Sequence, residues 1–107
     1  INLDREGLSQ AKTVCGDVAD ILKGLVLSGR KADLIVLDPP RDGCGKGVLD
    51  GVAALRPERI VYISCNPATQ ARDVHRLAGC GYGLNLLQPL DMFPQTGHIE
   101  VIASLTR

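Results

Sequence analysis

The chain has 107 residues, and its twelve basic and twelve acidic side chains leave a formal net charge of zero. That length suits one small domain, and the balanced charge alone does not indicate a nucleic-acid binder. No apolar run approaches the roughly 20 residues that span a bilayer, so we expect no membrane partner. The four cysteines form no CxxC pair, which indicates neither a metal site nor a disulfide framework and favours a reduced, cytoplasmic setting.

The first residues predict a helix that has already begun. The chain opens with Ile1, and INLDREGL (1–8) resembles the interior of a helix, so we expect the 107 residues to be a fragment of a longer protein. KTVCGD (12–17) predicts a short strand. Residues 18–29 carry apolar side chains at spacings of three and four, which predicts a helix.

Short apolar runs then alternate with helical segments. LIVL (34–37), between two aspartates, predicts a strand buried on both faces. The glycine-rich DGCGKG (42–47) has no phosphate-loop spacing, so we expect a flexible connection. Residues 48–57 predict a helix that stops before its proline, and RIVYISC (59–65) predicts the next buried strand. This alternation predicts βαβ units, a largely parallel sheet and an α/β fold.

The segment after the second buried strand predicts a capped helix. Asn66 is expected to cap it, with Pro67 at the first helical position, where a missing N–H is harmless. Gly79 or Gly81 is expected to end it.

Two apolar segments close the chain and predict an antiparallel hairpin. Residues 82–93 and 98–107 are joined by PQTG (94–97), a connection short enough for a hairpin. Pro89 fits an edge strand, because it cannot donate a hydrogen bond to a neighbouring strand.

Three side chains are expected around one rim of the sheet. Asp38 ends one buried strand and Cys65 ends the next, so both emerge at the carboxyl edge of a parallel sheet. Open α/β sheets build their ligand sites at that edge. Glu100 lies near the start of the last strand, and an antiparallel strand begins at the same edge.

Two interpretations of Cys65 remain open from position alone. It is either a small buried side chain at a strand end or a nucleophile, and the positive end of a following helix favours the nucleophilic thiolate. The polar turn formed with Ser64, Asn66 and Pro67 argues against the buried interpretation. Cys15, Cys44 and Cys80 lack this setting and are interpreted as structural or incidental.

The other candidates also have ordinary structural explanations. Asp-Pro-Pro after a strand is a common extended turn. Arg41 suits either a solvated surface charge or a phosphate contact, and Glu100 beside His98 suits an exposed strand carboxylate.

Four segments together resemble the C-terminal part of bacterial RNA uracil-5-methyltransferases that use S-adenosylmethionine. In chain order they are LDPPRDG, RIVYISCNPAT, ARD and DMFPQTGHIE. The likeness runs from about Gly16 to Arg107. It implies a partial Rossmann-like class I methyltransferase sheet whose first strands are missing. It also implies an RNA substrate, and the DMFP form favours 23S ribosomal RNA over tRNA.

The resemblance assigns roles to individual residues. Cys65 matches the nucleophile that adds to uracil C6, and Glu100 matches the base that removes the C5 proton. Asp38 matches the residue that holds the pyrimidine edge near the nucleophile, and it is also expected to bind the cofactor. Arg41 is expected to contact the substrate. Asp17 resembles the acidic residue that contacts the adenine of the cofactor.

Some features depart from the family pattern. Gln95 stands where the family usually has His, and Gln70 where it usually has Leu; neither position carries the expected chemistry. The glycine-rich turn that cradles the cofactor is absent from this chain. We therefore expect the chain to bind S-adenosylmethionine weakly or not at all, to catalyse nothing alone, and to self-associate as a homo-oligomer through exposed sheet edges.

Three alternatives compete with the methyltransferase hypothesis. The first is a non-catalytic, truncated α/β module that self-associates. The second is a cysteine hydrolase, which needs a histidine near Cys65; His75 falls two to three turns along the next helix and His98 is remote in sequence. The third, an amino-methyltransferase, would require an aromatic residue where the chain has Arg41.

Overall fold

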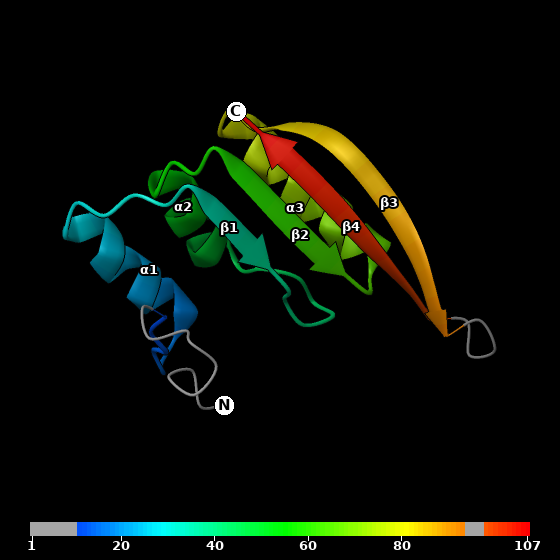
Figure 1. Ribbon diagram of the computed structural model, residues 1–107, viewed down its shortest axis with the longest axis horizontal. Helices are drawn as coiled ribbons and strands as arrows, with labels where there is room; N and C mark the ends of the chain where they lie inside the picture. The colour runs from blue at the N-terminus through cyan, green and yellow to red at the C-terminus, as the bar shows by residue number, and fades with distance from the viewer. Residues whose placement is uncertain (1–10, 94–97) are drawn as a thin grey trace.

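The computed structural model describes residues 11–93 and 98–107, which form a four-stranded sheet and three helices (Figure 1). In chain order the elements are α1 (Val18–Leu27), β1 (Leu34–Leu37), α2 (Lys46–Ala54), β2 (Arg59–Ser64), α3 (Pro67–Gly79), β3 (Gly83–Phe93) and β4 (His98–Thr106). The α/β class expected from the alternating runs is confirmed.

The sheet has the strand order β1-β2-β4-β3. β1 pairs parallel with β2, whereas β4 pairs antiparallel with both β2 and β3. Three of the four described strands therefore run in one direction and β4 runs against them. The expected hairpin of the last two strands is confirmed, and Pro89 lies on the edge strand β3 as predicted.

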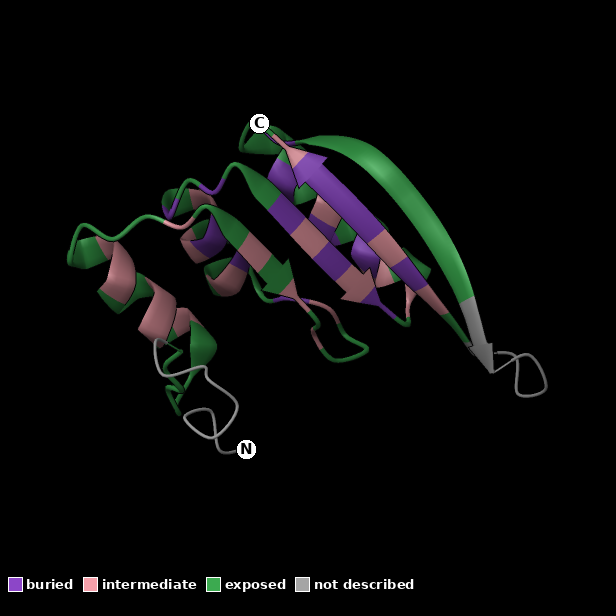
Figure 2. Ribbon diagram, viewed as in Figure 1, coloured by how far each residue is buried: buried purple, intermediate pink, exposed green. Residues whose placement is uncertain are grey.

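Helices α2 and α3 cover one face of the sheet, behind it in Figure 1. The core lies between them and the sheet, where Leu49 and Val52 of α2 and Leu77 of α3 are almost completely buried. The sheet contributes alternate residues of β2 and β4 to this core, namely Ile60, Tyr62, Ala103 and Leu105. Figure 2 shows that alternation along β2, whereas Ala103, Ser104 and Leu105 of β4 are all buried.

The opposite face of the sheet is open. Leu34 and Val36 of β1 are 54% and 58% exposed, so this strand is buried on one face only and the prediction of burial on both faces is wrong. The described side chains of β3 are exposed as well (Figure 2). We call the face that carries Leu34, Val36, Ile63 and Ile102 the open face.

The helix starts follow from local capping chemistry. Asn66 caps α3 through a 3.1 Å hydrogen bond from the Ala68 N–H, and Pro67 occupies the first turn, as predicted. Asp17 caps α1 in the same way, because its Oδ1 accepts the Asp20 N–H at 3.1 Å.

Several sequence-based expectations are corrected. Residues 12–17 form no strand, and they pair with none of the four described strands. The helix expected over 48–57 begins earlier, at Lys46, and ends at Ala54. Residues 1–8 and the connection 94–97 lie outside the described residues. In the part of the chain that is described, no helix is long and apolar enough to cross a membrane.

Candidate catalytic rim

The two parallel strands end at one edge of the sheet, where β4 enters (Figure 1). Asp38 directly follows β1 and Cys65 directly follows β2. The last rung of the β2–β4 ladder pairs Ser64 with Val101, so Cys65 and Glu100 are the next opposed residues beyond it. Opposed residues in antiparallel strands have Cα atoms about 5 Å apart. The register thus sets Cys65 next to Glu100, whereas the register of β1 and β2 sets Asp38 beside Ile63, two residues before Cys65.

The strand period also places these three residues on the same face. Leu34 and Val36 of β1 pair with Arg59 and Val61, and the alternation continued to the strand ends puts Asp38 and Cys65 on the open face. Glu100 shares that face, because it lies two residues before Ile102, which is paired with Ile63 of the open face. The site therefore opens away from the helices.

Cys65 is exposed, so the buried strand-end interpretation is wrong. It sits in a tight turn: the Asn66 N–H donates to Ser64 Oγ at 2.9 Å, and Ser64 Oγ donates to the Asn66 carbonyl at 3.0 Å. These bonds fix the backbone on both sides of the thiol and leave the thiol itself accessible. Cys15 and Cys80 are also exposed and free, whereas Cys44 is buried.

The connection after β1 is tied to the start of α3. The carbonyl of Arg41 accepts two hydrogen bonds, from Asn66 Nδ2 at 3.2 Å and from Thr69 Oγ1 at 3.0 Å. The Arg41 residue is exposed, so its side chain is accessible at the rim. The segment with Asp38 and Arg41 is thereby held next to the turn with Cys65.

A buried carboxylate anchors the same connection further along. Asp73 of α3 is 1% exposed, and its Oδ2 accepts the Cys44 N–H at 2.8 Å and the Tyr62 hydroxyl at 2.5 Å. Arg72 pairs with its Oδ1 at 3.1 Å and donates to the Asp42 carbonyl at 2.9 Å. The expectation that 42–47 is a flexible connection is therefore wrong: α3 holds its first half and Lys46 already belongs to α2.

This network raises the pKa of its neutral members. Burial raises the pKa of Tyr62 well above its usual value, and the hydrogen bond to Asp73 raises it further, since the hydroxyl must keep its proton to donate. Burial, followed by the negative charge of Asp73, raises the pKa of the Cys44 thiol. Cys44 is accordingly a structural cysteine and a poor nucleophile.

A cavity of about 470 Å³ lies at the carboxyl end of β1. Its walls are mostly apolar, with Val18, Leu37 and Val48 among them, and Asp38 contributes a carboxylate. Of the two predicted cofactor residues, Asp38 lines this cavity, whereas Asp17 precedes the lining residue Val18 and does not line it. Apolar walls with one carboxylate suit a small ligand that carries a hydrogen-bond donor.

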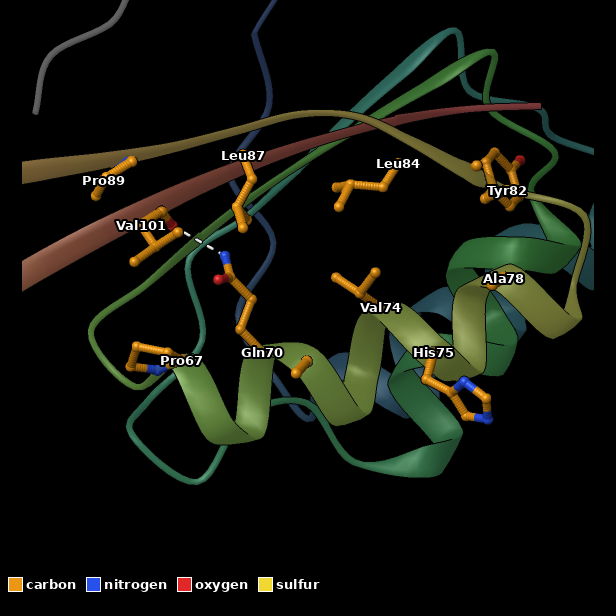
Figure 3. Close-up of a pocket in the computed structure, with 12 residues that line it drawn as sticks. Pro67, Gln70, Val74, His75, Ala78, Tyr82, Leu84, Leu87, Pro89 and Val101 are labelled. Atoms are coloured by element: carbon orange, nitrogen blue, oxygen red, sulfur yellow. Dashed lines mark hydrogen bonds between the residues drawn. The ribbon is translucent and has the colours of Figure 1, made fainter.

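A second cavity, of about 660 Å³, separates α3 from β3 (Figure 3). Ala71, Val74, Leu84 and Leu87 make its walls apolar, and none of the predicted site residues lines it. It opens on the face of the sheet opposite the rim residues. No group of three or more His, Cys, Asp or Glu side chains in the described ranges is arranged to hold a metal ion.

Comparison with known proteins identifies the family to which the chain belongs. A model of the tRNA (uracil-5-)-methyltransferase family matches residues 1–107. The chain belongs to this family. Relatives include an uncharacterized RNA methyltransferase of Geobacter sulfurreducens, 56% identical over 86% of this chain and 19% of the relative, and one of Caldanaerobacter subterraneus, 42% identical over 99% and 24%. The chain thus spans about a fifth to a quarter of the length of these relatives.

Solved structures support the same family and fold. The Pyrococcus abyssi tRNA (uracil-54, C5)-methyltransferase, in complex with S-adenosyl-L-homocysteine, is 42% identical with a TM-score of 0.62, over 69% of this chain and 18% of that chain. The M1.HpyAVI–SAM complex is 17% identical with a TM-score of 0.67, over 88% and 53%, and shows likeness of fold alone. The Rossmann-like methyltransferase fold expected from the sequence is confirmed.

Sequence reasoning missed the residues that hold the rim in place. Asn66, Thr69 and Asp73 recur at helical spacing on one side of α3, and their polar groups all bond the connection after β1. A polar stripe at that spacing on an otherwise amphipathic helix was the available signal. The motif ARD contained Asp73, but its buried bonds depend on residues distant in sequence.

Proposed function

We propose that this chain is the C-terminal part of the catalytic domain of an RNA uridine C5-methyltransferase. The observation that carries the proposal is the register that sets Cys65 opposite Glu100 at the open rim, in a chain of this family. An accessible thiol and a carboxylate at neighbouring positions are the nucleophile and base that this reaction requires.

Cys65 and Glu100 act at adjacent carbons of the uracil ring. The Cys65 thiolate adds to C6, and the electrons of the C5–C6 double bond move onto C5 and the C4 carbonyl oxygen. C5 then bonds to the methyl carbon as the bond from methyl to sulfur breaks. The Glu100 carboxylate removes the C5 proton, the double bond re-forms, and the Cys65 thiolate leaves. The proton passes from Glu100 to water, which restores both groups.

S-adenosylmethionine, when bound, supplies the electrophilic methyl group. The cavity at the carboxyl end of β1 fits the cofactor because it joins apolar walls to the Asp38 carboxylate. Asp38 would hold the pyrimidine edge beside the cofactor, and Asp17 would contact the adenine. Because Asp17 Oδ1 caps α1, only its remaining lone pairs are free for that contact.

The preferred substrate is 23S ribosomal RNA, and the sequence DMFP (91–94) supports this choice. The second candidate is tRNA, which the similar Pyrococcus abyssi enzyme favours by its description as a tRNA (uracil-54, C5)-methyltransferase. The exposed Arg41 at the rim suits a contact with the RNA phosphate backbone in either case.

We further propose that the 107 residues alone are inactive and self-associate. The exposed face of β1 carries apolar side chains, and one edge of this strand pairs with no other described strand; both features support self-association. The relatives are four to five times longer than this chain, which supports the proposal that the 107 residues alone are inactive. Isothermal calorimetry with S-adenosylmethionine tests the first part: we expect no measurable heat from the isolated chain. Clear binding by a monomer would contradict it.

Methyl transfer by the full-length protein tests the proposed function. The protein is incubated with methyl-labelled S-adenosylmethionine and unmodified transcripts of 23S rRNA or tRNA. We expect labelled 5-methyluridine in the 23S transcript, and none with Cys65→Ala. Cys80→Ala is the matched control, because Cys80 is also exposed and free but lies at the far end of α3. Full activity of Cys65→Ala would refute the proposal. Labelling of tRNA alone would show that the substrate is tRNA and not 23S rRNA.

A further inference from the structure

Gln70 is a buried polar side chain that joins β2 to β4 just inside the rim. It is 3% exposed, and its Nε2 donates to the carbonyls of Tyr62 at 3.1 Å and Val101 at 2.9 Å. Figure 3 shows it reaching from α3 to Val101. Both hydrogens of one amide group thus bond two neighbouring strands.

The Tyr62 and Val101 carbonyls lie on either side of the second-to-last residue pair between β2 and β4. The Ile63–Ile102 pair lies between them, with Tyr62 just before it on β2 and Val101 just before it on β4. Val101 directly follows Glu100. Gln70 therefore braces the two strand ends that present Cys65 and Glu100.

Packing alone does not explain a glutamine here. A leucine would fill a similar volume without the cost of burying an amide. The amide makes two hydrogen bonds that a leucine cannot make, and both go to the strands of the nucleophile and the base. Its contribution is thus geometric.

We propose that Gln70 is a positioning residue that fixes the separation of Cys65 and Glu100, and so controls removal of the C5 proton. This inference rests on the proposed function. Addition to C6 needs Cys65 alone, whereas proton removal needs Glu100 to reach C5 while C6 is bonded to Cys65. Loss of Gln70 therefore slows the second step more than the first.

A single-turnover experiment separates the two steps in the full-length protein. The RNA is the transcript, 23S rRNA or tRNA, that the wild type methylates, prepared with tritium at uracil C5. Labelled methyl in RNA reports methyl transfer, and tritium released to water reports proton removal. For Gln70→Met and Gln70→Leu we expect roughly a 10- to 100-fold slower tritium release at nearly unchanged methyl transfer, since about 1 Å of misplacement costs of order 10²-fold. Covalent protein–RNA complex should accumulate on denaturing gels.

The ratio of the two rates does not depend on how much protein is folded, because the same molecules perform both steps. Gln88→Met is the matched control. Gln88 is an exposed glutamine of the same sheet, and among the described residues its side chain bonds only the carbonyl of Pro89, so the ratio for Gln88→Met should equal that of the wild type. Equal slowing of both steps in the Gln70 variants, or no slowing, would overturn the inference. If instead Cys65→Ala still methylates RNA, the proposed function itself is wrong, whatever the Gln70 variants show.

Discussion

The Tyr62 hydroxyl donates to the Asp73 carboxylate at 2.5 Å, which ties β2 to α3 inside the core. The same carboxylate oxygen accepts the Cys44 N–H from the connection that carries Asp38 and Arg41. One buried charge therefore holds together three segments that meet at the rim: the connection after β1, the strand that ends just before Cys65, and the helix that follows it.

Replacing this carboxylate should destabilise the fold. Asp73→Asn removes the charge that its three donor groups share, and we expect a loss of about 2–3 kcal/mol in the free energy of unfolding, since bonds to buried charged groups contribute this much. Asp50→Asn is the control, because within the described part of the chain Asp50 makes just an exposed 3.7 Å ion pair with Arg76, and its loss should cost under about 1 kcal/mol. Chemical denaturation measures both. Equal losses would show that the Asp73 network contributes nothing special.

The close approach of the connection to Asp73 requires a glycine. Gly43 has φ +82°, and a Cβ there would lie 2.6 Å from Asp73 Oδ2 and 2.7 Å from Arg72 Nη2. Gly43→Ala should therefore cost more than the roughly 1–2 kcal/mol of a left-handed backbone alone. Gly29→Ala isolates that backbone cost, because Gly29 has φ +79° and open space around it. Thermal unfolding of the two variants would contradict this account if Gly29→Ala proved the more damaging.

Stability should fall in alkaline solution. Burial raises the pKa of Tyr62 above the value of about 10 that tyrosine has in the unfolded chain. Above that pH the unfolded chain loses the proton and the folded chain keeps it, so the free energy of unfolding declines by about 1.4 kcal/mol per pH unit for this group. Denaturation between pH 8 and pH 11, in steps of about one unit, measures the slope.

The variant Tyr62→Phe identifies the group responsible. It should be less stable at neutral pH but show a shallower decline above about pH 10, where tyrosine ionises in the unfolded chain. Burial also raises the pKa of Tyr82, so part of the slope should remain. A decline as steep as that of the wild type would assign the pH dependence to other groups.

The open face should drive association of the isolated chain. Val36 is 58% exposed at the centre of β1, and Val36→Lys places a charge there that favours the monomer. Leu27→Lys is the control, because Leu27 is 78% exposed but lies at the end of α1, away from the sheet. Light scattering at several concentrations should show oligomers for the wild type and Leu27→Lys, and a smaller species for Val36→Lys. A monomeric wild type would contradict the prediction.

Local rules explain what the sequence predicts correctly. Asn66 and Pro67 mark the start of α3 because capping depends on a few adjacent residues. The apolar runs predict β1 and β2, and the parallel order of their ends predicts a common edge for Asp38 and Cys65.

Long-range contacts explain what the sequence does not predict. The bond from Cys44 to Asp73 spans 29 positions, and no spacing rule encodes it. Gln70 bonds the carbonyl of Val101, 31 positions away. Residues 12–17 form no strand for a related reason, since strand pairing depends on long-range contacts and these residues pair with none of the described strands.

The most direct test of the central claim is whether Cys65 forms the covalent bond to uracil. In RNA that carries 5-fluorouridine, Cys65 can add to C6 and methyl transfer can follow, but Glu100 cannot remove fluorine as it removes a proton, so the adduct should persist. Denaturing gels and peptide mass spectrometry of the full-length protein should find the RNA attached to Cys65, with S-adenosylmethionine present. Attachment at Cys80 or Cys15, or no adduct from protein that methylates ordinary RNA, would contradict the account.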